Sequence, residues 1–328
     1  MDTTRQILSI QSHVVHGYVG NKAATFPLQY RGWNVDALNT VQFSNHPGYG
    51  SFTGFREHKA DMYQIIESGL INGLQLNYDV ILTGYLPSVH SLKSICELIN
   101  NICKEKNTPW ILDPVLGDNG KLYVDMECVN IYKELLSQCS IYLTVPNQFE
   151  METLTDIRIT DMGTLKRSLV KFHDLYPGVQ RVIVSSIDIG TKSKDGSGTY
   201  TVAFAEGKDF SKFKYFTVDK INAHFNGSGD LFSASLVDML FPHSREASSN
   251  PADLWEAIGK ALTLTHQILA RTYQLTIEED TNVSSKSKST VPHIKDLKLI
   301  QCTDLLRTDT LALQTDFPLC AYSDSDSD

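Results

Sequence analysis

The chain has 328 residues, of which 41% are hydrophobic and 20% are charged, and its formal net charge is −9. This balance is that of a globular protein large enough to bury a core without disulfide bonds. The acidic charge argues against a nucleic-acid-binding surface, and no apolar run reaches the roughly 18 residues of a membrane span.

The start of the chain and the cysteines indicate the compartment. Residues 1–6 lack the basic and apolar segments of a secretion signal, so we expect a cytoplasmic protein that could also enter the nucleus. The six cysteines show no pairing or Cys/His spacing typical of a metal site. We therefore expect free thiols in a reducing environment.

Segments with strand and helix patterns alternate along the chain, which predicts a three-layer α/β/α fold around a central, mostly parallel sheet. The expected core strands are Ile7–Gln11, Val35–Leu38, Val80–Thr83, Trp110–Leu112, Ile141–Val145 and Val182–Val184. The expected helices are Asn21–Tyr30, Ser88–Cys103, Val129–Leu136, Leu165–His173, Leu231–Leu240 and Asp253–Gln274. Pro27 predicts a kink or a late start in the first helix.

Other segments predict smaller elements. The Gly-rich and aromatic stretch Val41–Phe55 predicts an ordered loop or a small flap of strands. Tyr200–Ala205 and Phe213–Val218 predict a hairpin or an edge pair, and Leu297–Ile300 predicts a last strand.

The polar composition of the C-terminal part defines the expected domain limits. We expect one domain over residues 1–303, with a mobile Ser/Lys-rich loop over 278–292. Residues 304–328 end in an acidic repeat of serine and aspartate, and we expect this tail to be disordered.

Small polar or acidic residues follow the expected core strands at their carboxyl ends. In an open parallel sheet these ends lie along one edge, where ligands bind. Part of this pattern is expected without a site, because strands commonly lead into polar loops. The residues concerned are Ser12, Asn39, Thr40, Thr83, Gly84, Asp113, Asn147, Ser185 and Ser186.

Gly227 and Gly229 stand two positions apart, directly before an apolar run with helical spacing. The free N–H groups and the positive dipole end of such a helix suit a phosphate group. Asp230, in the first turn, could take a proton from a hydroxyl group. Serine, asparagine and aspartate at a helix start also act as caps, so this loop alone leaves both interpretations open.

Two acidic corners follow other strands. Asp113 and Asp118 could hold Mg²⁺ directly or through its waters, although an Asp-Pro turn with a solvated aspartate also explains that segment. Asn147 and Glu150 could face a metal–nucleotide complex, although a helix capping box explains this pair equally well.

Missing motifs argue against several classes of nucleotide-binding protein. The chain has no Gly-x4-Gly-Lys-Ser/Thr loop and no protein-kinase signature. The Gly-x-Gly loop lacks a third glycine and lies late in the chain, which argues against a dinucleotide-binding βα turn.

The chain resembles the pyridoxal kinase family of the ribokinase-like superfamily in several motifs that occur in the family's order over about the first 240 residues. The motifs are Ser9–Gln29, Val41–His46, Leu82–Tyr85, Asp113–Asp118, Pro146–Glu150 and Gly227–Phe232. Leu297–Gln301 also resembles the family's closing segment. Related sugar and hydroxymethylpyrimidine kinases share the Gly-x-Gly-Asp corner but not the N-terminal run.

The resemblance implies ATP-dependent phosphorylation of the 5′-hydroxymethyl group of pyridoxal, pyridoxine or pyridoxamine. It further implies a homodimer that uses ATP, Mg²⁺ or another divalent cation, and a monovalent cation such as K⁺.

The resemblance also implies roles for individual residues. Asp230 matches the catalytic base, and Gly227, Ser228 and Gly229 match the anion hole. The positions that match metal-binding residues are Asp113, Asp118 and Glu150. The positions that match the ATP side are Asp113, Asn147, Glu150, Ser185, Ser186, Phe225 and Gly227. The positions that match the vitamin side or its lid are Ser12, Val19, Phe43, His46, Pro47, Tyr85 and Tyr123.

The chain departs from the family at a few of these places. Pro47 and Val145 replace threonines, Asn226 replaces an apolar residue, and the segment 118–123 is shorter than in some members. Two alternatives stay open at this point. One is a related kinase acting on a hydroxymethylpyrimidine or a nucleoside. The other is a catalytically weak paralogue that binds pyridoxal phosphate or ATP as a carrier or sensor.

Overall fold

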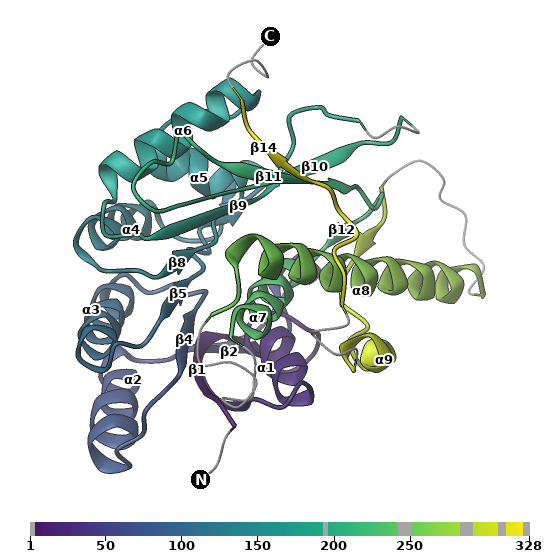
Figure 1. The fold of residues 1–328 in the computed structure, drawn as a ribbon. Helices are drawn as coiled ribbons and strands as arrows, with labels where there is room; N and C mark the ends of the chain where they lie inside the picture. The colour runs from purple at the N-terminus through teal and green to yellow at the C-terminus, as the bar shows by residue number, and fades with distance from the viewer. Residues whose placement is uncertain (1–3, 193–195, 242–250, 283–290, 308–312, 324–328) are drawn as a thin grey trace.

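The computed structural model describes residues 4–192, 196–241, 251–282, 291–307 and 313–323 (Figure 1). Within these residues, ten strands form one sheet. In spatial order they are β14 (Leu319–Ala321), β11 (Lys214–Asp219), β10 (Thr199–Glu206), β9 (Arg181–Ile187), β8 (Leu143–Thr144), β5 (Trp110–Leu112), β4 (Val80–Thr83), β1 (Gln6–Val14), β2 (Asn34–Phe43) and β3 (Gly54–Arg56).

The centre of the sheet is parallel and its two ends are antiparallel. Strands β9, β8, β5, β4, β1 and β2 run parallel to their neighbours within this group. Strands β10, β11 and β14 continue the sheet antiparallel at one end, and β3 does so at the other. The predicted mostly parallel sheet is confirmed.

Helices cover both faces of this sheet (Figure 1). One face carries α2 (Lys59–Gln64), the π-helical segment η2 (Ile65–Gly73), α3 (Val89–Lys106), α4 (Met126–Gln138), α5 (Gln148–Thr155) and α6 (Met162–Leu175). The other face carries α1 (Asn21–Tyr30), α7 (Ser228–Leu240), α8 (Leu254–Asn282), the short 3₁₀ helix η3 (Ile300–Cys302) and α9 (Thr303–Leu306). The three-layer prediction is therefore confirmed.

Alternating side chains of the central strands form a separate hydrophobic core on each face. Ile7 packs into the cluster with α1, α7 and α8, whereas its neighbour Leu8 packs into the cluster with α2–α6. Ile111 and Leu112 divide in the same way. Because successive side chains of a strand point to opposite faces, apolar runs buried on both sides are the expected pattern.

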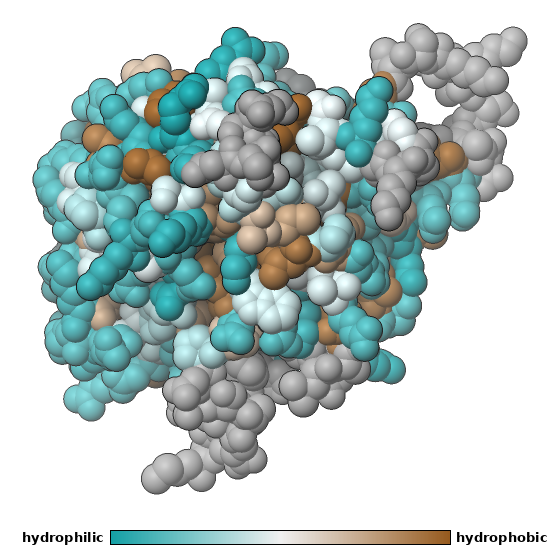
Figure 2. Space-filling model, turned by 45° about the horizontal axis from the view of Figure 1, so that its top comes forward, coloured by the Kyte–Doolittle hydropathy of each residue, from teal (hydrophilic) through white to brown (hydrophobic). Residues whose placement is uncertain are grey.

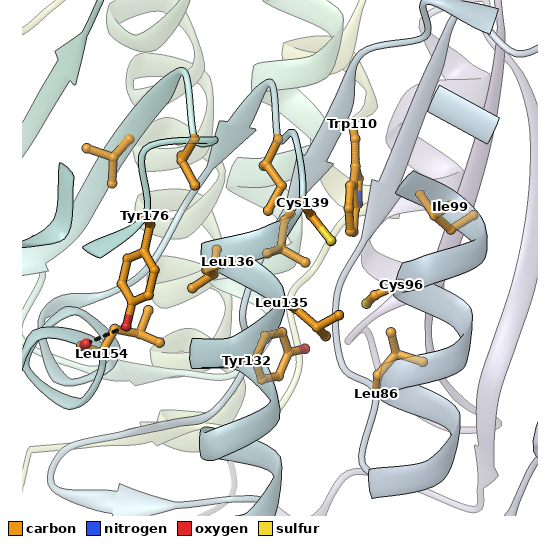
Figure 3. Close-up of a cluster of buried hydrophobic side chains, with 14 of the residues drawn as sticks. Leu86, Cys96, Ile99, Trp110, Tyr132, Leu135, Leu136, Cys139, Leu154 and Tyr176 are labelled. Carbon is orange, nitrogen blue, oxygen red and sulfur yellow. Dashed lines mark hydrogen bonds between the residues drawn. The ribbon is translucent and has the colours of Figure 1, made fainter. Parts of the chain in front are cut away.

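Trp110 shows how the core next to α3 and α4 is filled. Its ring lies among Cys96 and Ile99 of α3 and Leu135 of α4 (Figure 3). The indole N–H donates to the Thr83 hydroxyl at 2.9 Å, so its polar atom is satisfied inside the core.

Two local predictions need correction. Helix α1 begins at Asn21 with Pro27 inside it, so the late start was wrong. Strand β9 does not end before Ser185 and Ser186 but runs through them to Ile187. The two serines oppose Val202 alone, and Ser186 has a φ of 56°, which are the features of a β-bulge.

The flap and hairpin predictions are confirmed with one change. Val41–Phe43 belong to β2 and pair with the short strand β3, and the 3₁₀ helix η1 (Pro47–Tyr49) lies between them. Strands β10 and β11 pair antiparallel, but β11 is not an edge strand because β14 pairs with it.

The C-terminal part differs most from expectation. Leu297–Ile300 is not a strand, whereas His293–Ile294 (β13) pairs with His224–Phe225 (β12). Helix α8 continues to Asn282, into the loop expected over 278–292, and residues 283–290 lie outside the described residues. Within the expected tail, α9 forms at 303–306, and Leu313 and Phe317 are buried. Apolar burial thus orders the described part of this tail.

The helices and the surface show whether the chain has features of a membrane protein. None of the helices in the described part combines the length and hydrophobicity that a membrane span needs. Figure 2 shows one face that is largely hydrophilic, with hydrophobic side chains grouped near its centre.

Candidate active site

Asp230 is joined to a turn from the other end of the chain. It lies half-buried in the first turn of α7, and its Oδ2 accepts a hydrogen bond of 2.7 Å from the backbone N–H of Gly20. A Cβ at Gly20 would overlap the carbonyl and hydroxyl oxygens of Ser12. Ser12 is therefore packed against the same glycine that donates to Asp230. Burial raises the pKa of Asp230, and the Gly20 N–H opposes this effect.

The start of α7 has the properties of an anion site. Gly227 precedes the helix with a φ of 79°, and a Cβ there would overlap the carbonyl oxygen of Tyr18. This position therefore requires glycine. Within the described residues no N-cap side chain accepts from the first turn of α7, so the cap interpretation of this loop is not supported. The N–H groups of Ser228 and Gly229 remain suited to an anion.

Asp113 follows β5 and faces α7. It is only 8% exposed, and the hydroxyl of Ser233 in α7 donates to its Oδ2 at 3.0 Å. Burial raises the pKa of Asp113 to about 7, and the nearby charge of Asp230 adds to the rise. The structure thus brings the two predicted carboxylates together.

Glu150 and Asn147 hold the loop that contains Asp113. Glu150 accepts from the N–H groups of Asn147 at 2.8 Å, Leu116 at 2.9 Å and Gly117 at 3.4 Å. The Asn147 side chain accepts from the Glu150 N–H, and these two reciprocal bonds form the capping box of α5. Asn147 also donates from its side-chain amide to the Gly117 carbonyl oxygen. Burial and Asp113 raise the pKa of Glu150, while the three N–H donors oppose the rise.

Asp118 lies on a small hairpin that was not predicted from the sequence. Strands β6 (Gly117–Asp118) and β7 (Lys121–Leu122) are joined by Asn119 and Gly120, with φ values of 50° and 75°. An Asn-Gly pair is the commonest sequence signal for this two-residue turn and could have revealed it. The Asp118 carboxylate accepts from the Asn119 N–H at 2.7 Å, and the exposed Asp118 lines a large cavity.

The three predicted metal-binding carboxylates do not form a ready-made cage. Among the described residues, no three His, Cys, Asp or Glu side chains lie close enough to hold a metal ion together. Glu150 is occupied by backbone N–H donors, whereas Asp118 is open to the cavity. This donor set fits Mg²⁺ that is held mainly by phosphates and water, with a carboxylate approaching from one side.

The large cavity that Asp118 lines has a volume of about 1490 Å³ and opens beside the start of α7. Of the residues predicted for the ATP side, Ser185, Ser186 and Phe225 line it, together with Ser228 and Gly229 of the anion hole. Asp113, Asn147 and Glu150 are not among the lining residues and are held by the contacts described above. The bulge at Ser186 therefore lies in the wall of the cavity.

Residues predicted for the vitamin side gather elsewhere at the same edge of the sheet. Val19 and Tyr85 pack against the buried group Val14, Val41 and Phe43.

The remaining vitamin-side positions differ in exposure. His46 is 4% exposed, whereas Pro47 is exposed at the start of η1. The Tyr85 hydroxyl is 3.5 Å from the carbonyl oxygen of Tyr123, whose side chain is 57% exposed and lines the large cavity.

Several cavity residues had no sequence signal. His224 and His293 enter the wall through the β12–β13 pair, and His266 enters from α8. Arg158 is the only Lys or Arg among the described residues that line the cavity. These side chains are isolated in the sequence, and only the fold brings them together.

Comparison with known proteins gives a consistent result. The family model described as phosphomethylpyrimidine kinase matches residues 66–281. A putative pyridoxal kinase of Saccharomyces cerevisiae is 47% identical over 312 residues, which are 95% of each chain. The pyridoxal kinase of Arabidopsis thaliana is 38% identical over 274 residues, 82% of each chain. The structure of pyridoxal kinase from Leishmania donovani with ADP and pyridoxamine aligns with a TM-score of 0.77 at 28% identity, covering 97% of this chain and all of that one.

Proposed function

Because the chain belongs to the pyridoxal kinase family of the ribokinase-like superfamily, we propose that it transfers the terminal phosphoryl group of ATP to the 5′-hydroxymethyl group of a B6 vitamer. The observation that carries this proposal is the place of Asp230, at the start of α7 beside the large cavity and fixed by the Gly20 N–H. A proton acceptor and an anion site then lie in one turn of the chain.

In the proposed reaction Asp230 accepts the proton of the vitamer hydroxyl group. The hydroxyl oxygen forms a bond to the terminal phosphorus of ATP, the bond from that phosphorus to the bridging oxygen breaks, and ADP leaves. The N–H groups at Gly227, Ser228 and Gly229 would bind the charge that develops on the transferring group. No covalent intermediate with the protein is needed, because catalysis of phosphoryl transfer rests mainly on positioning and on stabilisation of charge.

A divalent cation such as Mg²⁺ would neutralise phosphate charge during the transfer. Of the three predicted metal-binding carboxylates, Asp118 is the one that lines the cavity and would approach the cation from there, and the buried Asp113 would act through water. Glu150 would contribute by holding the Asp113 loop rather than as a direct ligand. We retain a monovalent cation such as K⁺ as a proposal that rests on the family resemblance.

The ATP and vitamin sides are assigned by the same reasoning. Ser185, Ser186 and Phe225 would contact the nucleotide, because they line the cavity next to the start of α7. Ser12 would lie near the acceptor group, because Gly20 brings it close to Asp230. The group that packs around Phe43, with Val19 and Tyr85, would contact the vitamer ring.

The alternatives receive less support. A hydroxymethylpyrimidine kinase agrees with the description of the family model, but the relatives that match most of the chain are named pyridoxal kinases. A binding protein without turnover would not need the Gly20–Asp230 arrangement. Two of the departures from the family lie away from the pair of carboxylates Asp113 and Asp230. Val145 is 4% exposed in the hydrophobic core, and Pro47 is exposed at the surface, so neither substitution removes a group from that pair.

We also propose that the protein is a homodimer and acts in the cytoplasm, with the nucleus as the other compartment to examine. Light scattering after gel filtration tests the first statement, and imaging of a tagged chain tests the second.

The experiment that tests the function measures ATP turnover with pyridoxal, pyridoxine, pyridoxamine and a hydroxymethylpyrimidine. Wild type should phosphorylate a B6 vitamer, and Asp230→Asn should lose about 100- to 10,000-fold in kcat while still binding ATP. Turnover of the pyrimidine alone would move the protein to the sister activity. ATP binding without turnover of any acceptor would favour a carrier or sensor.

A further inference from the structure

Asp296 lies where three segments of the chain meet. It follows β13, and its Oδ2 accepts a hydrogen bond from the hydroxyl of Tyr49 in η1. The His16 Nε2, from the turn after β1, lies 3.2 Å from the Tyr49 oxygen and 3.6 Å from Asp296 Oδ2. The group of Asp296, Tyr49 and His16 therefore joins two N-terminal loops to the C-terminal segment, and we refer to it as the Asp296 junction.

The loop that contains η1 is held at a second point. The buried His46 donates from Nε2 to the carbonyl oxygen of Lys295 at 2.8 Å, which places the ring proton on that nitrogen when the ring is neutral. The His46 and Tyr49 rings are 4.9 Å apart, and the Lys295 ammonium lies 4.7 Å from the centre of the Tyr49 ring. Both ends of this short segment are thus fixed against residues 295 and 296.

The other side of Asp296 faces the turn that reaches the catalytic loop. A Cβ at Gly17 would overlap Asp296 Oδ1, so the turn and the carboxylate are in close contact. Three residues later, Gly20 donates its N–H to Asp230, and the Tyr18 carbonyl packs on Gly227. One turn therefore contacts both the Asp296 junction and the proposed anion hole.

We propose that Asp296 is a positioning residue for the phosphoryl acceptor. Through Tyr49 it fixes the loop that carries His46, and against Gly17 it fixes the turn that carries Gly20. Loss of either contact would let the acceptor side move relative to Asp230, and small displacements of reacting groups cost much of the rate. This inference rests on the proposed function, because it assumes that the vitamer binds beside His46.

The test uses Tyr49→Phe and Asp296→Asn in the full chain. Tyr49→Phe removes the donor of the hydrogen bond to Asp296, and Asp296→Asn removes the charge of its acceptor, both with almost no change in shape. We expect kcat/KM for pyridoxal to fall about tenfold in each, with KM for ATP within about twofold of wild type. The double variant should be no worse than Tyr49→Phe alone, because without the Tyr49 hydroxyl the charge of Asp296 no longer acts on that hydrogen bond.

Tyr63→Phe is the matched control, because it also removes a tyrosine hydroxyl that donates to a carboxylate. Tyr63 in α2 donates to Glu67 in η2 at 3.1 Å. It should leave both KM values unchanged. Equal changes in KM for ATP and for pyridoxal, or additive losses in the double variant, would overturn the inference. So would a lower melting temperature with unchanged kinetics. Wild type that phosphorylates no B6 vitamer would instead contradict the proposed function, so the two failures are distinguishable.

Discussion

The backbone N–H of Gly20 and the carboxylate of Asp230 are hydrogen-bonded at 2.7 Å although 210 positions separate the two residues. This contact fixes the side chain proposed as the base without using another side chain. It also makes the turn after β1 part of the catalytic arrangement, because Gly20 cannot move without releasing Asp230.

The first prediction concerns Gly20→Ala. The new Cβ would overlap Ser12, and Gly20 has a φ of 54°, so the N–H should move away from Asp230. We expect kcat to fall about 10- to 100-fold, with little change in KM for ATP. Gly207→Ala is the matched control, because Gly207 follows β10 away from the site and also has a positive φ, but an added Cβ there meets nothing within 4 Å. Equal losses in the two variants would indicate general backbone strain rather than displacement of Asp230.

The second prediction concerns pH and Asp113. Burial and Asp230 raise the pKa of Asp113 from 3.8 to about 7 in the folded protein. Between these two values the unfolded carboxyl group is ionised while the folded one is still protonated. The unfolded state then binds fewer protons, so the contribution of Asp113 to stability decreases as the pH rises from about 4 to about 7 and is constant above.

Asp113→Asn should therefore raise the free energy of unfolding at pH 8, by an amount on the order of 4 kcal/mol for a shift from 3.8 to about 7, and change it little at pH 4. The amide oxygen can still accept from Ser233, so the hydrogen bond is kept. Urea unfolding at the two pH values measures the effect, with the exposed Asp174→Asn as control. A variant that is destabilised equally at both pH values would contradict the raised pKa.

The third prediction concerns the buried ion pair that joins α1 to α7. Arg31 Nε donates to Asp238, which is fully buried and also accepts from the Trp33 indole N–H at 2.9 Å. Arg31→Met would leave this carboxylate without its cation and should cost about 3–5 kcal/mol in chemical unfolding. Lys133→Met breaks the pair with Asp156, which is 79% exposed, and should cost less than about 1 kcal/mol. Similar losses in both variants would contradict this distinction.

The sequence was sufficient for the central sheet because its signal is local. Apolar strands such as Val80–Thr83 and Trp110–Leu112 are short continuous runs, and the structure keeps both ranges unchanged. Alternation with helices then predicts parallel pairing and places Asp113 at the edge where ligands bind. The carboxylate pair of the candidate site could be expected on this basis.

Contacts between segments that are distant in the chain could not be predicted from the sequence. The Gly20–Asp230 bond and the Asp296–Tyr49 bond depend on backbone positions that only the folded chain defines. The roles of Asn147 and Glu150 were ambiguous because one Asn-x-x-Glu pattern serves both a cap and a site. Strand β14 was missed because its three residues pair with β11 about a hundred positions away and lie in a polar region.

The last prediction concerns this C-terminal segment and the nucleotide cavity. Phe317 is 8% exposed, and its ring meets that of His266 edge-on at 5.3 Å. His266 lines the cavity from α8 and is 3.2 Å from the carbonyl oxygen of Asp219 at the end of β11. Phe317 therefore supports a wall of the proposed ATP site from behind.

Phe317→Ala should lower the free energy of unfolding by about 3 kcal/mol, because it leaves a cavity between α8 and the segment before β14. It should also raise KM for ATP severalfold while KM for pyridoxal changes little, since His266 loses its support on the nucleotide side only. Phe55→Ala, at a phenylalanine that is 59% exposed, should change stability little. A destabilised Phe317 variant with unchanged KM for ATP would mean that the segment seals the sheet without shaping the cavity.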